Sequence, residues 1–198
     1  MFANRYTAVL DACVLAPPAN RDLILCLAEA KFFRPQWSER ILSEAEKAIA
    51  DIIRKRRPET ADAAAKARRV VEQMSEAFPE ATIDAAYEVY EQSLDLPDPN
   101  DRHVLAAAIH CRASTIVTDN LKDFPARELA KHGIEAKSAD DFIADEIDLD
   151  IIKAVGVVRN MRIRLKRPTI SASDLLLKME ARGLIETTRL LRPYEDLI

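Results

Sequence analysis

The sequence predicts an α/β fold built on a mostly parallel sheet. Two short apolar runs end in a carboxylate: residues 8–11 read Ala-Val-Leu-Asp, and residues 115–119 read Thr-Ile-Val-Thr-Asp. Apolar runs of this length between helical segments are typical of strands that are buried on both faces. Because open α/β sheets bind ligands at the carboxyl ends of their strands, Asp11 and Asp119 are candidate site residues.

The remaining pattern alternates helices and strands. We expect the first strand at 6–10, a helix whose first turn holds Pro17 and Pro18, and a short break or minor strand at 32–35. Ser38 fits the N-cap of a helix that ends in the basic run 54–57. Further helices are expected at 60–78, 84–92, 101–112, 125–133 and 139–144, and further strands at 114–117 and 134–136.

Composition limits the possible classes of protein. The chain has 198 residues, 48% of them hydrophobic, and a net charge of −4. We expect a domain at 1–147 and a helical C-terminal appendage at 148–198, where the composition becomes basic. Three widely spaced cysteines, no long apolar run and no signal-peptide pattern predict a cytoplasmic protein without a membrane span. The three glycines form no phosphate-binding loop, and no histidine pair has zinc-ligand spacing.

Acidic residues point to a hard divalent cation. Magnesium and manganese prefer carboxylate oxygens and need no histidine. Asp101 lies directly before an apolar helix, where it is equally explained as an N-cap, and Asp98 is equally explained as a turn residue. Glu44, on the helix after Ser38, reads by itself as an ordinary surface glutamate.

Basic residues cluster on the two helices before residue 80, although helix-end charges on a solvated face explain them equally well. Phosphate backbones are bound by such side chains with a strong dependence on salt. The candidate nucleic-acid contacts are Lys55, Arg56, Arg57, Lys66, Arg68 and Arg69.

Four segments together resemble the PIN-domain family, and in order and spacing the VapC-like ribonuclease toxins of bacterial toxin–antitoxin pairs. They are AVLDACVL at 8–15, WSERILSEAEKAI at 37–49, LPDPNDRHVLAAAI at 96–109 and TIVTDNLKDFP at 115–125. The resemblance covers about 5–145. It implies a three-layer α/β/α sandwich, and endonucleolytic cleavage of RNA that depends on Mg²⁺ or Mn²⁺.

The resemblance also implies site residues. Asp11, Asp101 and Asp119 would bind the metal, and Glu44 would hold a metal-bound water or ligate directly. The usual family pattern, Thr-x-Asp or Thr-x-Asn, places Asn120 at the fourth position, where we take the flanking Asp119 as the best acid. Asn120 and Asp123 are its alternates, and Asp98 resembles an accessory acid. Cys13 departs from the family, where many relatives carry asparagine.

The implied partners are RNA, with tRNA or ribosomal RNA possible, a cognate antitoxin protein and a second copy of the chain in a homodimer. The residues leave two other functions open: a housekeeping PIN nuclease in RNA processing, and a non-catalytic binding protein that keeps the fold. A phosphatase or receiver domain is less consistent, because the first strand lacks a paired acid.

Overall fold

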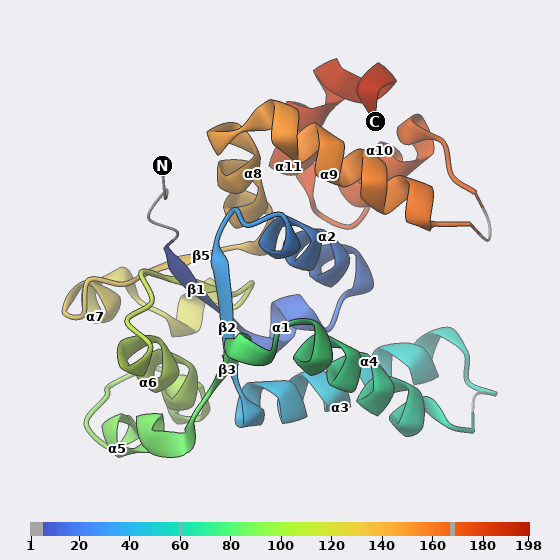
Figure 1. Cartoon of the computed structure of the whole chain (residues 1–198). Helices are drawn as coiled ribbons and strands as arrows, with labels where there is room; N and C mark the ends of the chain where they lie inside the picture. The colour runs from blue at the N-terminus through green and yellow to red at the C-terminus, as the bar shows by residue number, and fades with distance from the viewer. Residues whose placement is uncertain (1–5, 60, 167–168) are drawn as a thin grey trace. The chain divides into compact units, whose positions relative to one another are not determined.

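The computed structural model describes residues 6–59, 61–166 and 169–198 (Figure 1). Its contacts divide the chain into two compact units. Unit 1 holds the chain up to Pro17 together with Arg34–Lys137, and unit 2 holds Pro18–Phe33 together with Ser138–Ile198. The boundary expected between 147 and 148 stays a prediction.

Unit 1 contains a five-stranded sheet in the order β3-β2-β1-β4-β5, in which every neighbouring pair is parallel. This confirms the α/β class. The two-residue strand β3 was not expected, because so short a strand carries no periodicity. The strands are β1 (Thr7–Leu10), β2 (Arg34–Ser38), β3 (Thr82–Ile83), β4 (Thr115–Val117) and β5 (Glu135–Lys137).

The sheet is wound in two directions from β1, towards β2 and β3 and towards β4 and β5. Right-handed connections therefore place helices on both of its faces. Helix α3 packs on β2, whereas α6 packs on β1, β2 and β4. The helices of unit 1 are α1 (Ala12–Leu15), α3 (Glu39–Arg56), α4 (Ala63–Ala77), α5 (Glu88–Glu91), α6 (Arg102–His110) and α7 (Ala126–Ala130).

Helices α3 and α4 form the expected hairpin, and they lie side by side in Figure 1. Ser38 caps α3, since its Oγ accepts from the Ile41 amide at 3.2 Å. Small and branched side chains close the hairpin, including Ile49 and Ala50 of α3 and Ala67 of α4. The helix expected at 84–92 is instead a 3₁₀ turn, Ala85–Tyr87, followed by α5.

Unit 2 is helical, as expected for the C-terminal part. Its elements are α2 (Pro18–Glu29), α8 (Ala139–Leu149), α9 (Ile151–Arg164), α10 (Ala172–Glu180) and α11 (Ile185–Leu191). The Phe33 ring meets Phe142 of α8 edge-on at 4.8 Å between centroids. Of the helices that the structure describes, none combines the length and apolarity that crossing a bilayer requires.

A buried acid lies in α8. Glu146 is 0% exposed, and neither carboxylate oxygen has a hydrogen-bond partner among the described residues. Burial raises the pKa of this carboxyl to about 7. An unpaired carboxylate in a protein interior is costly, so Glu146 favours its neutral form.

Asp140 of α8 holds the start of α11. Its carboxylate accepts from the backbone amides of Ile185, Glu186 and Thr187 at 2.8–2.9 Å.

We expect Asp140→Ala to lower the free energy of unfolding of unit 2 by about 2 kcal/mol, because three amides lose a charged acceptor. Urea unfolding followed by circular dichroism measures this, and Asp148→Ala, at an exposed acid on the same helix, is the control. A loss of equal size in both variants would contradict the capping role.

Candidate active site at the carboxyl edge of the sheet

The site is centred where the winding direction of the sheet reverses. Strands β1 and β4 are parallel neighbours there, although more than 100 residues separate them, and Val9 is opposite Ile116. The Asp11 amide donates to the Val117 carbonyl at 3.0 Å, which extends the pairing by one residue. Such a reversal leaves a crevice outside the strand ends, the usual ligand position in open α/β sheets.

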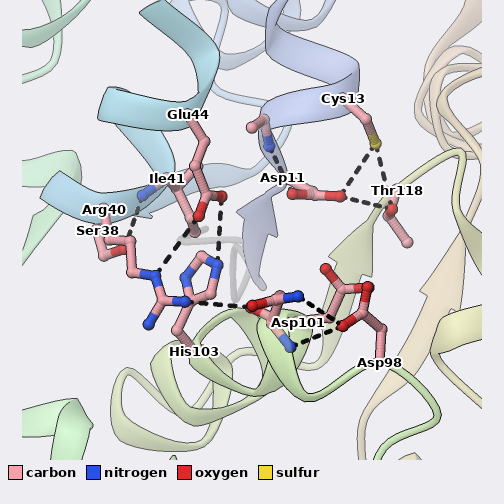
Figure 2. Close-up of polar contacts among 12 residues, drawn as sticks. Asp11, Cys13, Ser38, Arg40, Ile41, Glu44, Asp98, Asp101, His103 and Thr118 are labelled. Carbon is pink, nitrogen blue, oxygen red and sulfur yellow. Dashed lines mark hydrogen bonds and ion pairs between the residues drawn. The ribbon is translucent and has the colours of Figure 1, made fainter. Parts of the chain in front are cut away.

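Asp11 is fixed by three donors (Figure 2). Its Oδ1 accepts from the Ala12 amide at 2.6 Å, and its Oδ2 accepts from Thr118 Oγ1 at 2.7 Å and from Cys13 Sγ at 3.0 Å. The residue is buried and also serves as the N-cap of α1. The first predicted acid is therefore held rigidly, by a partner that comes from the end of β4.

Cys13 links the two strand ends. Besides Asp11, its Sγ lies 3.3 Å from Thr118 Oγ1 and accepts from the Asp119 amide at 3.3 Å. Burial and the Asp11 carboxylate raise the pKa of this thiol to about 12. The thiol therefore stays protonated and donates to Asp11, which does not suit a nucleophile.

Asp101 closes the 3₁₀ turn Pro99–Asp101, which precedes α6. The competing interpretation as an N-cap is not supported, because the Asp101 side chain makes no capping hydrogen bond. Asp98 caps the preceding 3₁₀ turn instead, since its Oδ1 accepts from the Asn100 amide at 2.9 Å. The Asp101 Oδ2 instead accepts from Asn120 Nδ2 at 3.2 Å.

Several carboxylates act on Asp101 at once. Burial and the charges of Asp11, Asp98 and Asp123 together raise its pKa to about 6, against the opposing effect of His103. Carboxylate charges that raise the pKa of another acid lie close to it, and a proton or a cation relieves the repulsion. The structure thus brings four acids to one edge of the sheet, and these are Asp11, Asp98, Asp101 and Asp123.

The donor chemistry fits a hard cation, since carboxylate and amide oxygens are what magnesium and manganese prefer. Among the described residues, no three Asp, Glu, His or Cys side chains already form a ligand set. The acid repulsion at Asp101 is nevertheless the state that a divalent cation would relieve.

Glu44 reaches the same region from α3, where it lies between Arg40 and His103 (Figure 2). Its Oε1 is 3.5 Å from Arg40 Nε, and its Oε2 is 3.2 Å from His103 Nε2. Burial raises the pKa of this carboxyl, but the hydrogen bond and charge of His103 and the charge of Arg40 outweigh burial, so the net pKa is lowered. Glu44 is thus kept ionised, whereas Asp101 binds a proton more readily than an ordinary aspartate.

The fourth position stays a prediction, but its candidates lie in different places. Asn120 contacts Asp101, and Asp123 is one of the charges that raise the pKa of Asp101. Asp119 has an exposed side chain, and its backbone amide faces Cys13. The geometry around Asp101 therefore favours the alternates Asn120 and Asp123.

Sequence reasoning gave no role to His103, to Arg40 or to the Thr118 hydroxyl. The spacing of Arg40 and Glu44, four residues apart on one helix, is a recognisable signal for an ion pair. His103 stands out only as a polar residue on the buried face of α6. Thr118 follows a buried strand directly, as the candidate acids do.

The basic residues divide into two groups. Lys66 pairs with Asp62 at 3.1 Å, and Arg68 with Glu46 at 3.6 Å. Arg54, beside the predicted set, pairs with Asp51 at 2.6 Å. Over the described parts of the chain, the remaining predicted cations have no acidic partner within salt-bridge distance, and these are Lys55, Arg56, Arg57 and Arg69.

Comparison with known proteins identifies the family. Residues 7–122 match the PIN domain model, which is more than half of the chain. The chain belongs to the PIN-domain family. Residues 139–193 match a second model, the VapC50 C-terminal domain, which confirms the resemblance to VapC-like proteins with a helical extension.

A curated relative matches part of this PIN-domain protein. Forty-nine residues are 55% identical to "Putative ribonuclease VapC50" of Mycobacterium tuberculosis (strain ATCC 25618 / H37Rv). The match covers 25% of this chain and 29% of the relative, so it spans less than a third of that protein. No solved structure matches the chain.

Proposed function

We propose that this PIN-domain protein is an endoribonuclease that hydrolyses RNA phosphodiester bonds with Mg²⁺ or Mn²⁺, and that it is the toxin of a toxin–antitoxin pair. The observation that carries the proposal is that the charges of Asp11, Asp98 and Asp123 act together on Asp101, where β1 and β4 end side by side. Family membership and the name of the VapC50 relative support it.

Each acid has a separate part in this proposal. Asp11 and Asp101 would hold the cation, together with Asp119 or its alternates Asn120 and Asp123. A bound cation of this kind lowers the pKa of a coordinated water and neutralises charge on a phosphoryl oxygen. Glu44, which is kept ionised, would accept a hydrogen bond from the attacking water and orient it.

The test is incubation of the purified chain with total tRNA and ribosomal RNA in Mg²⁺, in Mn²⁺ or in chelator. Discrete fragments that form only with metal support the proposal. Intact RNA in every condition, from a chain that circular dichroism shows to be folded, would favour the non-catalytic alternative. A small reading frame beside the gene, whose product forms a complex with the chain and stops cleavage, would separate a toxin from a housekeeping nuclease.

Unpaired cations at the end of α3 are expected to hold the RNA backbone. Replacing Lys55, Arg56 and Arg57 with glutamine should weaken RNA binding regardless of sequence, and should flatten the slope of log affinity against log salt by about 2. Fluorescence anisotropy over a range of salt concentrations measures this. The charge-neutral control is the double variant Arg54→Gln with Asp51→Asn, which removes an existing ion pair. Equal losses in the two variants would contradict the assignment.

A further inference from the structure

Glu44 is held from two sides by donors of different character. Arg40 is a shared and half-exposed donor, because its guanidinium also lies 3.3 Å from Glu91 Oε2 and 3.4 Å from the Asn100 carbonyl. His103 is 1% exposed and comes from α6, so it links α3 to the opposite side of the site. The more rigid of the two donors is therefore His103.

The His103 imidazole makes a single polar contact. Its Nε2 faces Glu44, and its Nδ1 is buried with no hydrogen-bond partner among the described residues. A buried nitrogen without a partner costs free energy, and an apolar side chain of similar size would fill the same space without that cost. Packing alone therefore does not account for a histidine at this position.

The direction of this contact suggests its role. A hydrogen bond from a ring that is locked in a helix fixes one carboxylate oxygen and leaves the other to Arg40 or to solvent. Groups that orient functional side chains in this way commonly matter about 10–100-fold for affinity or activity. Glu44 is half-buried and, without His103, would keep only the shared arginine.

We propose that His103 is a positioning residue, whose Nε2–H holds the Glu44 carboxylate in the orientation that it would need to accept a hydrogen bond from the attacking water. The inference rests on the proposed nuclease function, because it concerns the same site. It assigns His103 no contact with RNA and no transfer of a proton.

The test compares His103→Leu, which removes the donor, with His103→Gln, whose amide N–H can replace it. We expect His103→Leu to lower kcat at least about 10-fold while KM changes less than about twofold, since only the orientation of Glu44 is lost. His103→Gln should recover most of kcat. In a Glu44→Gln background, His103→Leu should cause no further loss.

The matched control is His110 at the other end of α6, which pairs with Asp84 at 3.3 Å. His110→Leu should leave kcat and KM unchanged. Urea unfolding of the metal-free chains gives a readout that needs no turnover. In double-mutant cycles of the unfolding free energy, His103 and Glu44 should show an interaction energy, whereas His110 and Glu44 should show none.

Three results would overturn the inference: equal loss of kcat in the Leu and Gln variants, additive loss with Glu44→Gln, or an effect on KM alone. A folded wild-type chain that cleaves no RNA in any metal would overturn the proposed function, and this inference with it. Cleavage by the wild type with an unaffected His103→Leu would overturn the inference alone.

Discussion

Asp11→Asn is expected to lower RNA cleavage by at least about 100-fold and to leave the fold intact. The substitution removes a negative charge from the acid of the site that is held by the most hydrogen bonds. Loss of a group that merely orients a metal ligand already lowers metal affinity or activity by about 10–100-fold. Asparagine keeps an acceptor oxygen for the Ala12 amide and is itself a good N-cap for α1. Single-turnover cleavage at saturating Mn²⁺ measures the effect.

Two controls make the Asp11 result specific. The thermal unfolding midpoint of Asp11→Asn should stay within a few degrees of the wild type, and the exposed acid substitution Asp95→Asn should cleave normally. A folded Asp11→Asn chain with more than a tenth of wild-type activity would show that the acids at the β1–β4 edge are not the catalytic centre.

Glu146 is expected to give unit 2 a pH-dependent stability. Its pKa is about 7 in the folded chain, against an ordinary value of 4.5. Between these values the folded state keeps a proton that the unfolded state has released, so the free energy of unfolding falls as the pH rises. By about pH 8 the loss from this one group amounts to about 3 kcal/mol.

Replacing Glu146 with leucine removes the buried carboxyl, so the variant should lack this fall in stability. The difference in unfolding free energy between variant and wild type should therefore grow by about 2.5 kcal/mol from pH 5 to pH 8. Urea unfolding at the two pH values measures it, with Asp148→Asn, an exposed acid on the same helix, as the control. Parallel pH profiles for Glu146→Leu and the wild type would contradict the prediction.

Local sequence patterns were sufficient to predict the main elements of the fold. The apolar runs that end at Leu10 and Val117 gave the two central strands, and Ser38 gave the start of α3. The acids Asp11 and Asp101 were recognisable because Asp11 directly follows an apolar strand and Asp101 directly precedes an apolar helix. Strand β3, and the division of the segment after Asp84 into a 3₁₀ turn and a short helix, could not be predicted. Elements of so few residues show no hydrophobic periodicity.

Contacts between residues far apart in the sequence could not be predicted from local patterns. Nothing near Glu44 in the sequence indicates that His103, on another helix, will hold it. Glu146 lies among other acids in α8 and resembles a surface residue, yet tertiary packing buries it completely. The fourth site position stayed open for the same reason, since Asp119, Asn120 and Asp123 follow one strand and only the turn decides where each side chain lies.

The Thr118–Asp11 hydrogen bond joins residues 107 positions apart, and this has a consequence during protein synthesis. A ribosome adds about 5–20 residues per second, so the acid at the end of β1 waits about 5–20 s for its partner strand to be translated. During that interval the nascent chain carries Asp11 and Glu44 without a completed crevice. Under the proposed function, cleavage of its own messenger by the growing chain would have to wait until translation has passed β4.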